Sequence, residues 1–97
     1  MKKQVFTESS GNVFLDLGFP AEEAQNLIVR ADLMIKVREV IRRRKLTQAR
    51  AAKLFGVTQP RISDLVRGKI DLFSVDGLLA MLGHAGMKVT IQIKSAA

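Results

Sequence analysis

This chain of 97 residues lacks several residue types on which catalytic and metal sites depend. It has no cysteine, which excludes disulfides, thiolate nucleophiles and cysteine-based zinc sites. It has neither tryptophan nor tyrosine, so the stacking platform expected for single-stranded RNA is missing, and RNA binding is a weak alternative. The one histidine, His84, lies near the end of a predicted helix, where a surface residue or a helix-dipole partner is expected rather than a metal ligand. We therefore expect neither an enzyme nor a cofactor or metal site.

Long apolar runs are also absent. No segment approaches the roughly 20 apolar residues that a bilayer span needs, and the two lysines at the start have no apolar run behind them. We therefore expect a cytoplasmic protein without a signal peptide or membrane contact. The hydrophobic residues, 47% of the chain, are enough for the core of one small domain.

The net formal charge of +7 is concentrated in the middle of the chain. Residues 36–69 hold eleven basic and two acidic side chains, a formal charge of +9, whereas residues 1–35 carry −2 and residues 70–97 are neutral. Such a cluster attracts a polyanion, because binding releases the counterions condensed on that polyanion. The charge therefore indicates that the middle segment binds nucleic acid.

The chain divides into three predicted parts. Residues 1–19 form an N-terminal arm, in which the apolar stretch 13–19 is either an extended piece or a plug against the core. Residues 20–86 form a helical domain, and residues 87–97 form a C-terminal β-strand and tail. The fold class predicted from this order is mainly α with one C-terminal strand.

Capping signals and apolar spacing place the outer helices of the domain. The first begins at Pro20 and runs to about Arg44, either as one long helix or as two with a bend near residues 30–32. The last runs from Val75 to about Ala85, with Ser74 as its N-cap and a glycine that ends it.

Residues 46–69 are the most informative stretch, because they read as two short helices joined at Gly56. The two helices of such a pair cross closely, so a small residue is needed at the crossing, and Ala52 provides it. Gly56 tolerates the positive φ of the turn, and Val57 fills the angle behind it. The predicted buried face of the second helix is Ile62, Leu65 and Val66. This is the arrangement of a helix-turn-helix, which lays its second helix in the major groove.

The start of the second helix is the part that reaches base edges in a helix-turn-helix. Glutamine can bridge adenine N6 and N7, and arginine can fork onto guanine O6 and N7. We therefore predict four residues that contact bases and four that contact phosphates. The predicted base contacts are Thr58, Gln59, Arg61 and Ser63. The predicted phosphate contacts are Gln48, Arg50, Arg67 and Lys69.

Three of the polar side chains in this helix have a second interpretation. Thr58 is expected to cap the helix through its hydroxyl. Arg61 is equally suited to a base or a phosphate, and Asp64 is expected to pair with Arg61 or Arg67 rather than to read a cytosine.

Residues 88–94 alternate strictly between polar and apolar side chains. Val89, Ile91 and Ile93 share one face, which predicts a half-buried β-strand. Because a lone strand leaves its backbone groups unpaired, this one must pair with residues 13–17 or with the same strand of a second chain. We favour the second chain, because that pairing also explains a homodimer.

Residues 31–86 resemble the Cro and lambda-repressor (XRE) family of helix-turn-helix regulators. The resemblance lies in Leu46-Thr47-Gln48, Gly56-Val57-Thr58-Gln59 and Arg67-Gly68-Lys69. It implies a lambda-repressor-like helical bundle that binds double-stranded DNA. Pro60 departs from the pattern, because many relatives carry a polar base reader there.

The whole chain is similar to a narrower group, the small bacterial antitoxins of the HigA type. The matching segments are Gly11-Asn12-Val13-Phe14, Leu17-Gly18-Phe19-Pro20, Arg30-Ala31-Asp32-Leu33, Thr58-Gln59-Pro60-Arg61 and Phe73-Ser74. This similarity implies a homodimeric repressor at the bacterial nucleoid, which binds a palindromic operator and autoregulates its operon. It also implies a type II toxin–antitoxin pair with a RelE- or HigB-like RNase toxin as partner. The alternatives are a protein-interaction module and a phage-type repressor without a toxin.

Overall fold

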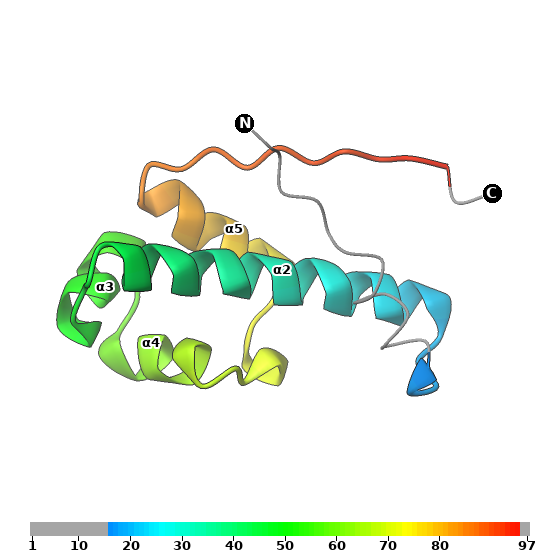
Figure 1. Cartoon of the computed structure of the whole chain (residues 1–97), viewed down its shortest axis with the longest axis horizontal. Helices are drawn as coiled ribbons and strands as arrows, with labels where there is room; N and C mark the ends of the chain where they lie inside the picture. Colours follow the sequence, from blue (N-terminus) through cyan, green and yellow to red (C-terminus); the bar gives the residue numbers. More distant parts are fainter. Residues whose placement is uncertain (1–15, 96–97) are drawn as a thin grey trace.

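The computed structural model describes residues 16–95, and the predicted N-terminal arm lies almost entirely outside this range. Within it, four α-helices and one short 3₁₀ helix follow one another along the chain (Figure 1). They are α2 (Ala21–Arg43), α3 (Gln48–Phe55), α4 (Gln59–Val66), η1 (Ile70–Leu72) and α5 (Val75–His84). The mainly helical class is confirmed.

The longest element, α2, is one helix of 23 residues, so the alternative of two helices with a bend does not apply. Glu22 and Glu23 lie in its first turn and Arg42 and Arg43 in its last. Each pair therefore sits at the helix end whose partial charge it offsets. Three elements, α4, η1 and α5, pack on α2, whereas α3 packs on α4 and α5.

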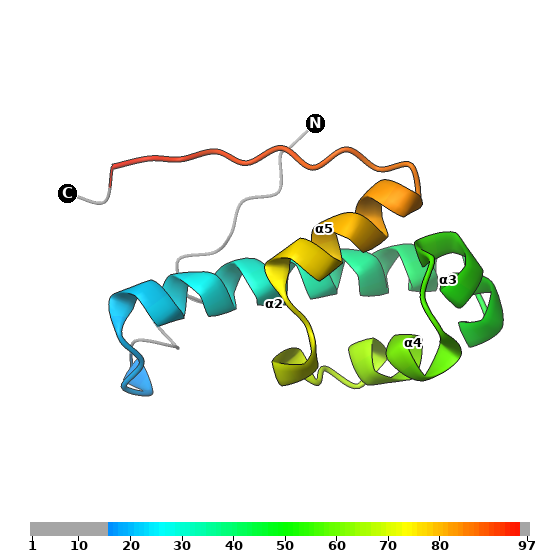
Figure 2. The same ribbon diagram turned by 180° about the vertical axis from the view of Figure 1, so that it is seen from behind.

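The core lies where the four helices meet, and α4 runs along the edge of the molecule away from the C-terminal segment (Figures 1 and 2). One continuous buried cluster joins all four helices, and Phe73, which lies between η1 and α5, also belongs to it. Its largest fully buried side chains are Phe55, Ile62, Leu65, Leu78 and Val37. Arg30 adds a polar link to this packing, because its Nη1 donates to the Ile70 carbonyl at 3.1 Å and so ties η1 to α2.

The predicted C-terminal strand is not seen, since residues 16–95 contain no β-strand. Residues 87–95 instead run extended and without secondary structure from the end of α5 (Figure 1). Of the alternative partner segment, residues 13–15 lie outside the described range, and residues 16–17 belong to a helical turn. Residues 88–94 have the alternating pattern of a strand, but no described segment of the same chain pairs with them. Because a strand forms only by hydrogen bonding to another strand, these residues remain without regular structure.

Candidate nucleic-acid interface

The crossing of α3 and α4 has the features expected from the sequence. Thr47 Oγ1 accepts from Arg50 N at 3.1 Å and caps α3. Gly56 ends that helix with φ 70°, and Val57 N then donates to the Ala52 carbonyl at 3.0 Å. Ala52 itself is 8% exposed, which is the small buried residue that the close crossing needs. The turn between the helices is therefore defined by local hydrogen bonds and by one left-handed glycine.

His84, the last residue of α5, contacts this turn, and the sequence did not predict this role. Its Nδ1 lies 3.0 Å from the Leu54 carbonyl oxygen, and because a carbonyl only accepts, Nδ1 must carry the hydrogen. A Cβ built on Gly56 would lie 2.8 Å from Cδ2 of the His84 ring. Gly56 is thus required twice, once for its positive φ and once for the close approach of the imidazole.

The buried face of α4 is narrower than predicted. Ile62 and Leu65 are fully buried, whereas Val66 is 36% exposed, so the prediction that Val66 belongs to the buried face is wrong. Successive helical residues are turned by about 100° from each other. Because Leu65 points directly into the core, the side chain of Val66 is turned away from the core and lies at the edge of the buried face.

The outer face of α4 is polar and open. Its N-cap, Thr58, accepts from Arg61 N at 3.4 Å, as predicted, and the side chain is exposed. Gln59 and Pro60 are exposed in the first turn, and Ser63 follows as a half-buried residue one turn later. Thr58 and Gln59 therefore lie at the accessible start of the helix, whereas Ser63 lies in its second turn and is only partly accessible.

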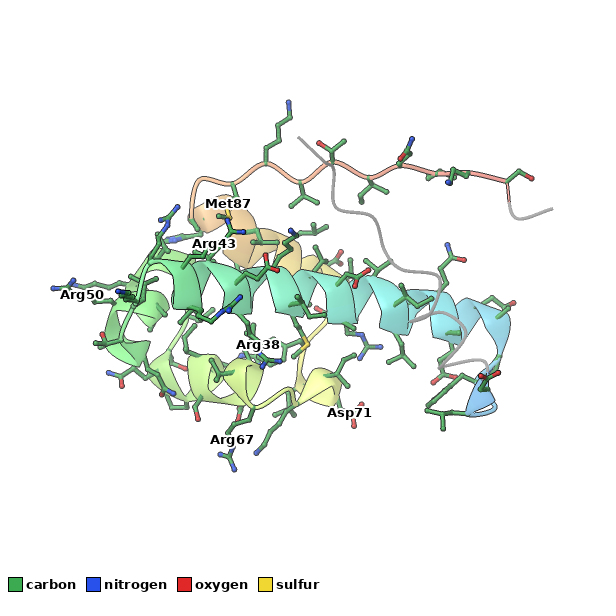
Figure 3. The ribbon with its side chains drawn as sticks, in the orientation of Figure 1. Arg38, Arg43, Arg50, Arg67, Asp71 and Met87 are labelled. Carbon is green, nitrogen blue, oxygen red and sulfur yellow. The ribbon has the colours of Figure 1, made fainter. Side chains whose placement is uncertain are left out.

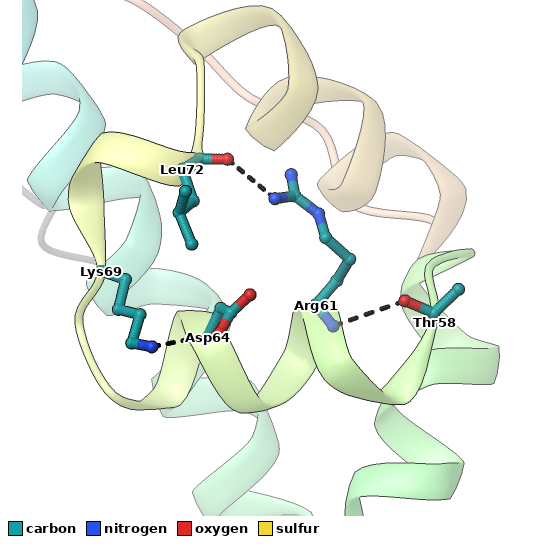
Figure 4. A network of polar contacts seen from close by, with 5 residues as sticks. All are labelled: Thr58, Arg61, Asp64, Lys69 and Leu72. Atoms are coloured by element: carbon teal, nitrogen blue, oxygen red, sulfur yellow. Dashed lines mark hydrogen bonds and ion pairs between the residues drawn. The ribbon is translucent and has the colours of Figure 1, made fainter.

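The side chain of Arg61 points toward the carbonyl group of Leu72 at the end of η1 (Figure 4). Its Nη1 donates to the Leu72 carbonyl at 2.7 Å, and its guanidinium carbon lies 4.2 Å from the centre of the Phe73 ring. Phe73 is only 4% exposed. Arg61 therefore clamps α4 to the chain segment between η1 and α5, through a charge-assisted hydrogen bond and a cation–π contact.

The ion pair at the end of α4 joins Asp64 to Lys69, rather than to Arg61 or Arg67 as expected. Lys69 Nζ lies 3.7 Å from Asp64 Oδ1 (Figure 4). Gly68, just after α4, has φ 76°, and Lys69 N donates back to the Asp64 carbonyl at 3.1 Å. This reversal of the chain brings the lysine to the carboxylate. Asp64 is half-buried, whereas Lys69 is exposed, so the ammonium group stays accessible.

The predicted phosphate contacts lie on two sides of the outer face. Gln48 and Arg50 are exposed in the first turn of α3, and Arg67 and Lys69 are exposed at the end of α4. Figure 3 shows Arg50 and Arg67 extending away from the body of the molecule at these two places. The structure thus puts cationic side chains on both flanks of the α4 surface.

A further pair of cations, Arg38 and Arg42, lies beside α4 and was not assigned to the interface from the sequence. Both line a groove of about 540 Å³ between α2 and α4. The remaining lining residues are Ile35, Glu39, Ile41 and Val66. The four-residue spacing of the two arginines, which places them on one face of α2, was the available signal.

One carboxyl outside this surface has an altered titration. Burial raises the pKa of Asp32 on α2, and the positive charge of Lys36 opposes that rise. The Oδ2 atom of Asp32 is buried and has no hydrogen-bond partner.

In residues 16–95, no three His, Asp or Glu side chains come together as a potential metal site. None of the helices in this range has the length and apolar character that a bilayer crossing needs.

The comparison with protein families agrees with this geometry. A family model described as a helix-turn-helix domain matches residues 13–94. The chain belongs to this helix-turn-helix family. The match covers all four helices and almost all of the extended C-terminal segment, so the helix-turn-helix domain occupies most of the chain. No curated protein matches the chain. A helix-turn-helix domain is a DNA-binding unit, and α4 is the second helix of this pair.

Proposed function

We propose that this protein is a sequence-specific transcriptional repressor that binds a palindromic operator in double-stranded DNA as a homodimer. The observation that carries the proposal is the outer face of α4, which is polar, exposed and flanked by cations on both sides. A recognition helix with this character enters the major groove, because its base-reading side chains are free while its apolar side holds it to the domain.

Base recognition in this proposal depends mainly on Gln59. It is exposed at the first position of α4, where a side-chain amide can bridge N6 and N7 of adenine. The exposed hydroxyl of Thr58 and the half-buried hydroxyl of Ser63, one turn further along α4, supply single hydrogen bonds to either kind of base. Arg61 would have to leave Leu72 and Phe73 to reach a base, so we assign its main role to stability.

Affinity in this proposal comes from the phosphate contacts. Gln48 and Arg50 contact the phosphate backbone of the DNA at the start of α3, and Arg67 and Lys69 contact it beyond the end of α4. Such contacts fix the register of the helix on the duplex without reading its sequence. Each neutralised phosphate releases counterions, so binding weakens as salt rises.

We further propose that the repressor is the antitoxin of a type II toxin–antitoxin pair, acting in the bacterial cytoplasm and controlling its own operon. This part rests on the resemblance of the whole chain to HigA-type antitoxins, which implies a RelE- or HigB-like RNase as the partner. A protein-interaction role is favoured by a separate observation. Ile35 and Val66 are 47% and 36% exposed and line the same groove, which is an apolar surface available to another protein.

A gel shift with the DNA upstream of the protein's own reading frame tests the repressor. We expect specific retardation of this DNA at a salt concentration at which random DNA of equal length is not retained. Equal retention of both would overturn the sequence-specific function. Co-purification from the native cell followed by mass spectrometry tests the antitoxin, with an RNase encoded next to this chain as the expected partner. Recovery of no such protein would favour a repressor without a toxin.

A further inference from the structure

The extended segment after α5 carries an apolar row that begins on the core and then leaves it. Met87 and Val89 pack against the buried cluster, whereas Ile91 is 63% exposed and Ile93 is 89% exposed. Within residues 16–95, no backbone–backbone hydrogen bond involves residues 88–94. An extended segment with open backbone groups and an exposed apolar row is a template for pairing with another strand.

We propose that two copies of this chain pair through residues 87–93 as an antiparallel ribbon centred on Thr90. The inference deepens the homodimer of the proposed function by naming its surface and register. In this register Val89 lies opposite the partner's Ile91, and Met87 lies opposite the partner's Ile93. Each exposed isoleucine is then placed beside a side chain that the core of the other copy supports. This coverage is reciprocal, as a two-fold interface requires.

Charge separates this register from one centred on Ile91. Centred there, the ribbon would place Lys88 directly opposite the partner's Lys94, and like charges in that position destabilise a strand pair. Centred on Thr90, it places Lys88 opposite the partner's Gln92 and brings the two threonines together, which is a favourable cross-strand pair.

Apolar pairing separates it from a register centred on Gln92. That register would set Val89 opposite the partner's Ser95 and Ile91 opposite the partner's Ile93, so Met87 would face none of the four apolar side chains of the row. The register centred on Thr90 is therefore the one that uses all four apolar side chains of the row.

The backbone of Met87 fixes which pairs are hydrogen-bonded. Its N–H already donates to the Leu82 carbonyl at 2.9 Å, at the end of α5, so Met87 must occupy a non-hydrogen-bonded pair. The two kinds of pair alternate along an antiparallel ribbon. The apolar pairs therefore fall at the closer Cα separation of about 4.5 Å, and the two Thr90 residues form a hydrogen-bonded pair at about 5.5 Å.

Because the chain contains no cysteine, single introduced cysteines can report this register. The substitutions Thr90→Cys, Lys88→Cys and Gln92→Cys all replace exposed residues on the polar face, so the fold is not disturbed. Two Cα atoms about 5.5 Å apart are within disulfide range, so Thr90→Cys is expected to link to itself. The other two variants each place their thiols four residues apart along the ribbon, roughly 13 Å, which is too far.

The experiment is oxidation of the full chain with oxidised glutathione, without DNA, followed by non-reducing electrophoresis. We expect Thr90→Cys to form a covalent dimer at least tenfold faster than Lys88→Cys or Gln92→Cys alone. A mixture of the last two variants should form the mixed dimer, since their positions lie opposite each other. The unmodified chain should sediment as a dimer, and Ile91→Lys should shift it toward monomer.

A monomeric chain, or self-linking at position 88 or 92 as fast as at position 90, would overturn the inference. Because the cross-linking assay contains no DNA, its result does not depend on operator binding. Failure of operator binding would therefore refute the proposed function without contradicting the ribbon. A dimer that binds the operator but does not link through position 90 would refute the ribbon alone.

Discussion

Replacing Arg61 with alanine distinguishes a structural clamp from a base reader. The substitution removes a charge-assisted hydrogen bond of 2.7 Å to the Leu72 carbonyl and a cation–π contact of 4.2 Å to the Phe73 ring. A hydrogen bond from a charged group contributes about 1.5–3 kcal/mol, and a solvent-accessible cation–π contact about 0.5–1 kcal/mol. Arg61 is half-buried, and water can replace part of the hydrogen bond, so we expect a loss of about 1–3 kcal/mol in the free energy of unfolding.

Urea unfolding followed by circular dichroism measures this loss, and thermal unfolding should show Tm falling by roughly 5–20 °C in a domain of this size. The matched control is Arg67→Ala, which removes an exposed arginine six residues later and should change stability by less than about 0.5 kcal/mol. If Arg61→Ala folds as stably as the control but loses base discrimination, Arg61 reads DNA and the clamp is refuted.

Three other changes have expected outcomes that follow from single features of the structure. Gly56→Ala should destabilise the domain by about 2–3 kcal/mol in urea unfolding, because it combines a positive φ with a contact of 2.8 Å to His84. Gly68→Ala has the same backbone cost but open space around the new Cβ, so an equal loss in both variants would show that the imidazole contact contributes nothing. Asp32→Asn should raise Tm at pH 7. Its carboxyl has a folded-state pKa above the usual 3.8, so the charged form disfavours folding, and this penalty disappears as pH falls through the folded-state pKa. Variant and parent should therefore converge below pH 3.8, and an unchanged difference there would contradict burial as the cause. Arg67→Ala should reduce the slope of log K against log salt by about 0.9 per chain in a gel-shift titration. Arg43→Ala, on the side of α2 nearer the C-terminal segment (Figure 3), should leave that slope unchanged, and equal effects would place the DNA elsewhere.

Local signals in the sequence predict the helices well, because a helix end depends on residues within one turn of it. Thr58 and Ser74 cap α4 and α5 through hydroxyls that accept from N–H groups three residues later, as expected. Gly56 ends α3 with a positive φ, again as expected, and Gly68 has a positive φ just after α4. The outer face of α4 follows from the same short-range periodicity.

Contacts between distant residues are what the sequence alone did not reveal. Arg61 has a partner eleven residues away at Leu72, and His84 has one thirty residues away at Leu54. Both pairings depend on how α5 and η1 fold back on the helix-turn-helix, which no local pattern specifies. The alternation of residues 88–94 likewise predicts a strand without giving information about its partner.

The most direct test of the whole account is Gln59→Ala, measured by gel shift on the operator, on operators altered at single base pairs, and on random DNA. Gln59 is exposed at the first position of α4, so its loss should remove about 1–3 kcal/mol of discrimination at one base position per half-site. Affinity for random DNA should stay nearly unchanged, whereas Arg67→Ala should weaken all sequences alike. If Gln59→Ala instead loses affinity equally for the operator and for random DNA, α4 does not read the sequence and the proposed function is wrong.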